Sequence, residues 1–524
     1  MRDLPAGRIV LGVAVVLVVG GLYGLSGVKH SVTLSAGPAV SPVRSVAVTS
    51  ATRACPSPGW AGGAGGAVAV MAAPATSGPA TSGPATSGPA TSGTGEVAVN
   101  RLAGAGSAAG GTHLFSLTSP GYVQITGVAT ATGASARSQQ ASGQSVATVP
   151  LHGGVVVRAH GAMAQGLEVE QTAAGGLPTA SCGSPGTDFW FVGPGQHGAS
   201  HIELFLMNPG AQAANADVDI FTDAGPVQGS TADTGITVPP HGMVMQLLAP
   251  MVQGSRSLML HVRTSTGQVV AAVQESTGTG PGAWLPAAQI PATHLVLPGL
   301  PGTAGSRQLY VAVPGAGDAK IRVEAVTSRG SYQPTGTGGI DVAGGSSADI
   351  DLPSLGGIPA GIKLTSNVPV TAVAMATGGA QGAPGAFTAA TPAIQEQGVV
   401  ADDLSAAGRV SSLVISAPGG AAKVRVVEAA RAAAAGSVRQ SVQVVHVAAG
   451  HSVVLPLVPV PGTPKGSAFS VVITPLAGSG PVYAGRVIAG TGAGGALQAI
   501  LPVPSALSSV PLPPVRNSFV ASGS

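Results

Sequence analysis

Few residues of this 524-residue chain stand at spacings that support catalysis. Glu168 and Glu170 alternate around Val169, so a strand would carry both carboxylates on one face. A pair of carboxyl groups can act as general acid and base, but the same alternation is typical of a half-solvated sheet. We expect both carboxylates to be solvated, and we predict no catalytic residues.

A calcium site is the first metal site to consider. Asp217, Asp219 and Asp223 offer carboxylate oxygens, the ligands that calcium prefers. The stretch Asp-Ala-Gly-Pro at 223–226 is better explained as a hairpin turn. We therefore predict no metal site.

Two further patterns resemble catalytic or cofactor motifs. Asp188, His197 and His201 lie near one another along the chain, with Ser200 between them. Catalytic triads assemble from distant segments, so we expect loop histidines without a catalytic role. Residues 490–495 fit GxGxxG, yet the chain reaches Pro502 without room for the helix that a dinucleotide needs. No cofactor is predicted.

The two cysteines of the chain, Cys55 and Cys182, predict a disulfide. An exported protein with an even cysteine count usually pairs them. The alternatives are two unpaired thiols or a metal site, and no pair of histidines at ligand spacing supports the latter. The bond would tie the first module to the start of the second.

An aromatic cluster at Phe189, Trp190 and Phe191 stands out in a chain with only 3% aromatic residues. We expect these rings to be buried, because large aromatic side chains contribute most to a core whose other side chains are small. An exposed ligand platform is the alternative.

The composition excludes one class of partner. Charged residues make up 8% of the chain and the net charge is +3, so no basic cluster neutralises several phosphates. We therefore predict no nucleic acid partner. Glycine (80 residues), proline (43) and abundant valine indicate an all-β protein with many turns.

The N-terminus carries a hydrophobic segment. Residues 9–28 are uncharged and about long enough to span a bilayer as a helix. Arg2 and Arg8 precede this segment, which keeps that end in the cytoplasm and sends the body outside. We predict an uncleaved single-pass anchor with an extracellular body; cleavage as a signal peptide, followed by secretion, is the alternative.

The body of the chain contains internal repeats. Apolar strands end in Pro-Gly turns at 204–210, 309–315 and 413–419, about 105 residues apart. Each unit holds about seven short strands in about 100 residues, which is typical of an immunoglobulin-like β-sandwich. We predict tandem sandwiches, with a propeller-like fold as the alternative.

The predicted domains follow these repeats. The sequence Pro-Ala-Thr-Ser-Gly occurs four times at 74–93, and we expect it to form a disordered insert in the first module. The alternative is an O-glycosylated spacer. Domains are placed at 1–30 (cytoplasmic tip and anchor), 31–180 (first module), 181–292 (second), 293–395 (third) and 396–524 (fourth, with the C-terminal tail).

The sequence Cys-Gly-Ser-Pro-Gly-Thr-Asp-Phe-Trp-Phe-Val-Gly at 182–193, followed by the Asn-Pro-Gly turn at 208–210, resembles a family of actinobacterial membrane-anchored proteins catalogued as a domain of unknown function. In the other two Pro-Gly turns, at 313–315 and 417–419, Val313 and Ala417 replace the asparagine. The resemblance implies export and a repeated β architecture, and it brings no mechanism.

These observations predict a non-enzymatic cell-envelope protein that acts as scaffold, spacer or binding surface. Its partners would be the membrane, through the N-terminal helix, and an envelope glycan or protein. The alternative is an envelope hydrolase or carbohydrate-binding protein whose site is assembled from loops.

Overall fold

The computed structural model of the protein describes residues 45–56, 67–72, 95–101, 113–117, 139–141, 154–160, 164, 166–172, 179–227, 235–276, 282–302, 305–353, 355–378, 385–400, 409–431, 438–458, 460–462, 469–490, 498–507 and 509–511. The predicted anchor and the repeat insert lie outside these residues. Within these ranges, no helix is long and apolar enough to cross a membrane.

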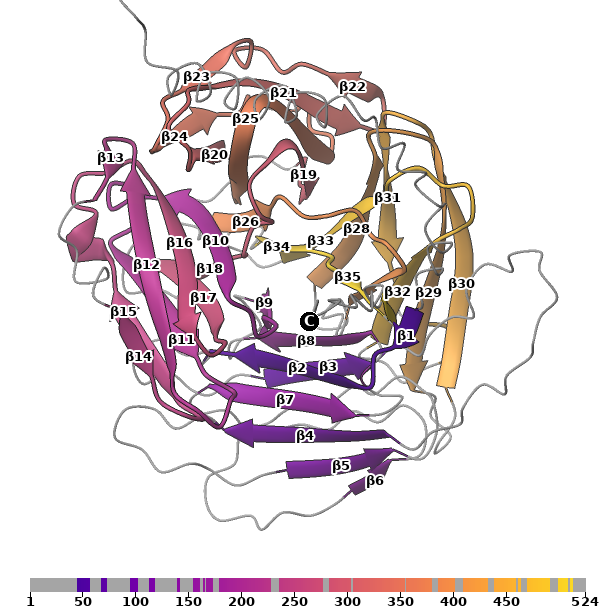
Figure 1. Ribbon diagram of the computed structural model, residues 1–524. Coiled ribbons are helices and arrows are strands. Elements are labelled where there is room, and N and C mark those ends of the chain that lie inside the picture. The colour runs from indigo at the N-terminus through magenta and orange to yellow at the C-terminus, as the bar shows by residue number, and fades with distance from the viewer. Residues whose placement is uncertain are drawn as a thin grey trace, which may run out of the picture. The chain divides into compact units, whose positions relative to one another are not determined.

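The chain divides into two compact units, one comprising Met1–Val46 and Pro511–Ser524, the other Ala47–Val510. Strands β1 (Ser45–Ala47) and β36 (Ser509–Pro511) stand at the limits of these units along the sequence. The described residues of the larger unit lie almost entirely in antiparallel sheets and the turns between them (Figure 1). The prediction of an all-β fold is confirmed.

The second module shows the arrangement that recurs in the others. One sheet has the order β10-β16-β12-β13, with β14 also paired to β12, and the other has the order β15-β11-β17-β18. A short 3-10 helix, Ala249–Met251, follows β15. The strands are β10 (Asp188–Pro194), β11 (His201–Met207), β12 (Ala214–Thr222), β13 (Gly225–Pro226), β14 (Ile236–Val238), β15 (Met243–Leu247), β16 (Ser257–Thr266), β17 (Val270–Ser276) and β18 (Ala283–Leu285).

The third and fourth modules repeat this order. In the third, one long strand, β25, takes the places of both β16 and β17. Its strands are β19 (Ala292–Leu300), β20 (Arg307–Val313), β21 (Ala319–Thr327), β22 (Gly330–Tyr332), β23 (Ile340–Val342), β24 (Ser346–Asp351), β25 (Ala360–Thr377) and β26 (Gly385–Ala389). In the fourth they are β27 (Gln397–Val400), β28 (Arg409–Ala417), β29 (Ala422–Arg431), β30 (Val438–Val447), β31 (His451–Leu457), β32 (Phe469–Pro475), β33 (Tyr483–Gly490), β34 (Gln498–Pro502) and β35 (Ser505–Ala506).

The first module is a fourth copy of the same unit. Its sheets have the orders β2-β7-β4-β5-β6 and β3-β8-β9. The orders β2-β7-β4 and β3-β8-β9 match β10-β16-β12 and β11-β17-β18 of the second module. Strand β6 differs, because it pairs in parallel with β5. The predicted insert at 74–93 falls between β3 and β4, where the other copies have their Pro-Gly turn. The strands are β2 (Ser50–Cys55), β3 (Ala67–Ala72), β4 (Gly95–Arg101), β5 (His113–Leu117), β6 (Gln139–Ala141), β7 (Val155–His160), β8 (Leu167–Thr172) and β9 (Thr179–Ser181).

The sandwiches differ from an immunoglobulin constant domain in one pairing. There the first two strands share a sheet. Here the first strand of a module lies in the sheet of the third, as β10 does by pairing with β16, which also pairs with β12. The second strand lies in the other sheet, where β11 pairs with β17.

Alternation of small apolar and polar residues explains why these segments form half-buried strands. In β12, Ala216, Val218 and Ile220 are buried, whereas Asp217 and Asp219 between them are partly exposed. A strand places successive side chains on opposite faces, so this period of two turns one face to the core.

The Pro-Gly turns lead from the second strand of a module into its third. The buried Asn208 fixes the first of them, because its Nδ2 donates to the carbonyl oxygen of Gln212 (2.7 Å) and its Oδ1 accepts from the amide of Gly210 (2.8 Å). Val313 and Ala417 stand at this position in the other copies and make no such side-chain bonds. Their backbone carbonyls accept from Gly345 and Gly450 instead.

Neighbouring modules pack closely within the larger unit. Ala54 and Val156 of the first module share a small apolar cluster with Met207 and Val270 of the second. The core of the second module extends into the third through residues that include Tyr310, Val373 and Phe387. The modules therefore form a packed assembly, not a row joined by extended linkers.

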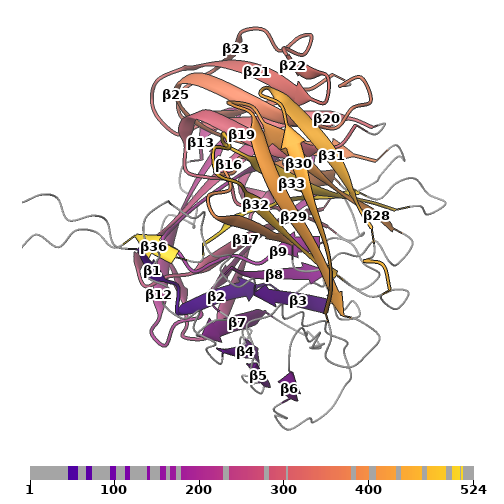
Figure 2. The ribbon, with the colours of Figure 1, turned by 90° about the vertical axis from the view of Figure 1, so that its right-hand side faces the viewer.

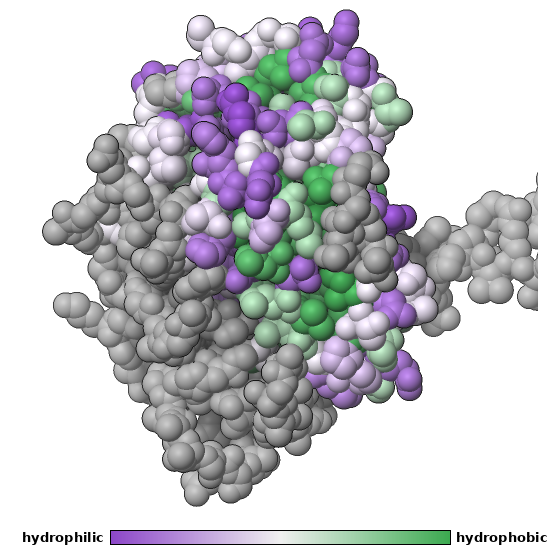
Figure 3. Space-filling view, turned by 90° about the vertical axis from the view of Figure 1, so that its left-hand side faces the viewer, coloured by the Kyte–Doolittle hydropathy of each residue, from purple (hydrophilic) through white to green (hydrophobic). Residues whose placement is uncertain are grey.

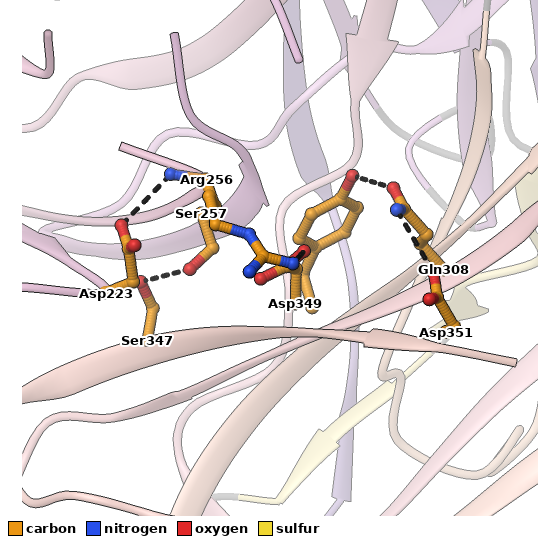
Figure 4. Close-up of polar contacts among 8 residues, drawn as sticks. Asp223, Arg256, Ser257, Gln308, Ser347, Asp349 and Asp351 are labelled. Atoms are coloured by element: carbon orange, nitrogen blue, oxygen red, sulfur yellow. Dashed lines mark hydrogen bonds and ion pairs between the residues drawn. The ribbon is translucent and has the colours of Figure 1, made fainter. Parts of the chain in front are cut away.

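Polar contacts add to the interface of the second and third modules. Arg256 pairs with Asp349 (2.8 Å), and the hydroxyl groups of Ser257 and Ser347 lie 2.9 Å apart (Figure 4). The backbone amide of Arg256 also donates to Asp223 (3.0 Å). Ser257 and Ser347 are buried, so each satisfies the other where water has little access.

The third and fourth modules meet backbone to backbone. A Cβ atom at Gly485 would lie 2.6 Å from the Cα of Gly299, so neither position has room for a side chain. The hydroxyl of Ser452 donates to the carbonyl oxygen of Val326 (2.6 Å) at the same interface. In Figure 2 the strands of the fourth module face the viewer, with β29 and β30 side by side.

One strand from each module, β9, β18, β26 and β34, lies in the middle of the larger unit (Figure 1). β18 contacts β26, β26 contacts β34, β34 contacts β9, and β9 contacts β18. These contacts form a closed ring that includes one strand of each of the four modules. The Pro-rich segments that contain β18 and β34 thus form edge strands of their sheets.

Candidate functional site

A cavity of about 290 Å³ lies where these central strands meet. All four modules or the segments that follow them contribute to its wall, which mixes polar and apolar side chains. Its residues include Arg53, Glu168, Gln171, Ser181, Phe191, Trp284, Leu285, Thr391, Ile500 and Leu501.

Glu168 is the most unusual residue of this wall. It is 2% exposed, and burial raises the pKa of its carboxyl group to about 8, although the Arg53 guanidinium opposes the rise and Glu170 adds to it. The hydroxyl of Ser181 hydrogen-bonds the carboxyl group. Its Oε1 atom has no hydrogen-bond partner among the described residues. The carboxyl group is therefore largely protonated at neutral pH.

Glu170 belongs to a different contact. It pairs with Arg486 of the fourth module at 2.9 Å, and both side chains are buried. Arg486 also donates from Nε to the hydroxyl of Ser411 (3.1 Å). A buried ion pair that loses one partner leaves an uncompensated charge, so this contact holds the first module against the fourth.

The expectation that Glu168 and Glu170 are solvated is wrong. They lie on one strand face, as the alternation predicts, but the face of β8 that carries them points into the packed center of the larger unit. The pattern Glu-Val-Glu shows that the two carboxyl groups share a face. It does not show that Arg486 of the fourth module, more than 300 residues away, packs against that face.

Arg53 is the cation of the cavity wall. Its guanidinium donates to the carbonyl oxygens of Thr52 (3.1 Å) and Leu167 (2.8 Å). Burial lowers its pKa, and the nearby Glu168 carboxyl opposes that change. Strand β2 thus supplies a guanidinium group, and backbone carbonyl oxygens accept hydrogen bonds from some of its N–H groups.

Two further residues of the cavity wall are buried. Gln171 of β8 is 1% exposed and Trp284 of β18 is 7% exposed. Neither Oε1 of Gln171 nor Nε1 of Trp284 has a hydrogen-bond partner within the described ranges. The Trp284 ring also packs against Phe205, with centroids 5.6 Å apart. Sequence analysis did not single out either residue, because both fall in ordinary strand patterns.

The predicted disulfide is present and borders the cavity. Cys55, at the end of β2, is bonded to Cys182, just after β9, with Cα atoms 4.8 Å apart. Cys182 is itself part of the wall. The bond fixes β2, and with it Arg53, beside the strand that leads into the second module.

The aromatic cluster is largely buried, as predicted. Phe191 lines the cavity and Trp190 is 8% exposed. The Trp190 ring stacks on His261 with centroids 3.6 Å apart. His261 also lies 3.0 Å from Asp188, and burial lowers its pKa.

The three aspartates considered for calcium do not form one site. Asp219 pairs with Arg263 at 2.8 Å, and Asp223 accepts the Arg256 amide at the hairpin. Among the described residues, no group of three metal-ligating side chains is present. The hydroxyl of Ser200 donates to the backbone carbonyl oxygen of Ser276 (3.2 Å). Residues 491–495 of the GxGxxG stretch lie outside the described residues.

Fold and cavity together define an all-β protein of four like sandwiches around a mixed polar and apolar center. The chain belongs to a family of unknown function (DUF5719), which matches residues 136–458. The match spans Glu168, Gln171 and Trp284 but ends before Arg486. No curated protein matches the chain. The actinobacterial origin that the resemblance implied stays a prediction.

Proposed function

We propose that this protein is an exported, membrane-anchored cell-envelope protein that works without catalysis, as a rigid scaffold that presents a binding site. The observation that carries the proposal is the Cys55–Cys182 disulfide, because such bonds persist in oxidising compartments outside the cytoplasm. The hydrophobic stretch at residues 9–28 would hold the body at the membrane.

The packing of the modules supports a rigid scaffold over a flexible spacer. Shared apolar clusters and a buried ion pair join modules that are distant in sequence. Such interfaces leave little freedom for the modules to move independently. On the face shown in Figure 3, hydrophobic residues gather in small groups among hydrophilic ones.

Export is tested on intact host cells treated with an external protease. We expect the body to be cleaved while a cytoplasmic marker stays whole, and the undigested protein to migrate faster without reductant than with it. A protected body with two free thiols would contradict the proposal.

One observation favours the alternative of an envelope hydrolase: Glu168 has a carboxyl group that is protonated near neutral pH, as a general acid needs. Glycoside hydrolysis uses a second carboxylate, and Glu170 is held by Arg486. Purified protein is incubated with envelope glycan, and new reducing ends are measured. We expect none; release that Glu168→Gln abolishes would establish the hydrolase instead.

A further inference from the structure

Strand β30 forms one edge of its sheet, which has the order β30-β29-β32-β27-β35. It runs for ten residues, Val438–Val447, and each of them pairs with a residue of β29 without a register shift. Among the described residues, its other side pairs with no strand. Figure 1 shows β30 on the outside of the larger unit, away from the central strands. Every second residue of β30 therefore directs its N–H and C=O groups away from β29.

The second and third modules protect the sheet edge at the same position. There, β12 pairs with two residues of β13 and three of β14, and β21 pairs with three residues each of β22 and β23. Short strands and prolines, such as the one in β13, keep an edge from pairing with another chain. In contrast, β30 is long, has no bulge and contains no proline, lysine, aspartate or glutamate. Its edge is thus suited to the addition of a further strand.

The outer face of β30 is exposed and apolar at its middle. Val442 and Val444 are 59% and 50% exposed. Gln440 and His446 lie on the same face, one on either side of the valines, and are also exposed. Val442 lies opposite Val427 of β29, so the apolar surface continues across the sheet. Exposed valines on a long unpaired edge are typical of strands that associate.

The order of these side chains is symmetric about Gln443, and this symmetry favours a second copy of the chain as the partner. In an antiparallel pair of two β30 strands centred on Gln443, Val442 of one copy lies opposite Val444 of the other. Gln440 then lies opposite His446. All four exposed side chains thus meet a counterpart of their own kind, apolar with apolar and polar with polar.

Other centres and the strand's charge were compared with this arrangement. A centre on Val442 would set Val444 opposite Gln440, and a centre on Val444 would set Val442 opposite His446, so each mixes apolar with polar side chains. With the centre on Gln443, the two copies of Arg439 lie roughly 27 Å apart. This distance exceeds the screening length of about 8 Å at physiological salt, so their repulsion is small.

We propose that two copies of the protein associate by antiparallel pairing of their β30 strands, with the two-fold axis at Gln443. The sheet of the fourth module then continues into the sheet of the second copy. One pair of strands is a small interface, so the dimer is expected to be weak in solution. Self-association concerns the purified protein and holds or fails independently of export.

Sedimentation of the purified full chain in detergent, from about 1 µM to about 200 µM, tests this inference. We expect wild type to pass from monomer to dimer as the concentration rises. Val442→Lys combined with Val444→Lys sets like charges opposite each other and should weaken association at least about tenfold. Both valines are exposed in the single chain, so the melting temperature of the dilute protein should not change.

A charge-swap variant tests the register of the pairing. Val442→Lys combined with Val444→Glu sets a lysine opposite a glutamate at both positions of the dimer. We expect it to associate at least about ten times more tightly than the double-lysine variant. A centre on Val442 or on Val444 would instead set two lysines or two glutamates opposite each other, and association would not recover.

Cross-linking gives a second measurement of the same register. Position 443 lies opposite itself in the proposed dimer, so Gln443→Cys should form a disulfide between two copies under mild oxidation. The two copies of position 440 lie about 20 Å apart, so Gln440→Cys should not. Cross-linking of Gln440→Cys in preference to Gln443→Cys would contradict the register.

The matched control uses exposed valines of the same module outside β30. Val410 and Val458 are 54% and 56% exposed, and Val410→Lys combined with Val458→Lys should leave association at the wild-type level. Three results would overturn the inference. Wild type that stays monomeric would leave the edge to an extended segment of another protein. A double-lysine variant that associates like wild type would place the contact on another surface. A charge-swap variant no tighter than the double-lysine variant would exclude the pairing of Val442 with Val444.

Discussion

At the scale of single residues, the cavity depends on side chains whose burial the local sequence does not reveal. Glu168 and Glu170 occupy the strand face that alternation assigns to them, but one is protonated and the other is paired with Arg486. An alternating pattern says that two residues share a face. It does not say whether that face meets water or another module.

The raised pKa of Glu168 makes stability depend on pH. The folded state holds the proton up to about pH 8, whereas the unfolded chain releases it near 4.5. The folded state thus binds more protons in this window, so the free energy of unfolding falls as pH rises through it, by up to about 1.4 kcal/mol per pH unit. Urea unfolding between pH 5 and 8 measures this slope.

Glu168→Gln should flatten that dependence, because the amide is neutral at every pH. Glu275, a second buried carboxyl group with a pKa raised by burial to about 8, offers a matched variant outside the cavity. Glu275→Gln should remove a similar part of the slope, and the double variant should remove both. A double variant with the wild-type slope would refute the assignment.

At the scale of strands, most of the fold could be predicted from the sequence. The Pro-Gly turns and the period of two gave the strands and the sandwich class, and the two cysteines gave the disulfide. The pairing of β10 with β16 could not be predicted, because alternation fixes a strand's faces but not its neighbours. The likeness of the first module to the others was hidden by the insert at 74–93.

The close approach of β19 and β33 at the interface of the third and fourth modules leads to a second prediction. Gly485→Ala places a methyl group against the backbone of Gly299. This steric clash is removed only if β19 and β33 move apart. We expect a loss of about 1–3 kcal/mol in the free energy of unfolding. Gly315→Ala is the matched control, because a Cβ atom there meets nothing within 4 Å. Equal stability of the two variants would argue against this interface.

At the scale of the whole larger unit, the modules share cores, which repeats in a sequence cannot reveal. The spacing of about 105 residues predicts similar units and is equally compatible with separate or packed ones. The cavity could not be predicted from the sequence for the same reason. Its wall contains residues as distant along the chain as Arg53 and Leu501, and only the packing of all modules brings them together.

Shared packing means that the second and third modules should unfold together. Phe387 of the third module is 2% exposed and belongs to the core of the second. Phe387→Ala should cost about 3–5 kcal/mol. In a Trp60→Phe background, Trp190 and Trp284 report on the second module by fluorescence, and circular dichroism reports on all strands. Midpoints from the two signals should shift together; a shift in circular dichroism alone would show that the modules unfold separately.

The most direct test of the closed arrangement is a double-mutant cycle on the buried ion pair of Glu170 and Arg486. Chemical unfolding is measured for wild type, Glu170→Gln, Arg486→Met and the double variant. We expect each single change to cost about 3–5 kcal/mol, and the double change to cost less than their sum by at least about 1 kcal/mol. Losses that add to within about 0.5 kcal/mol would show that the first module does not meet the fourth.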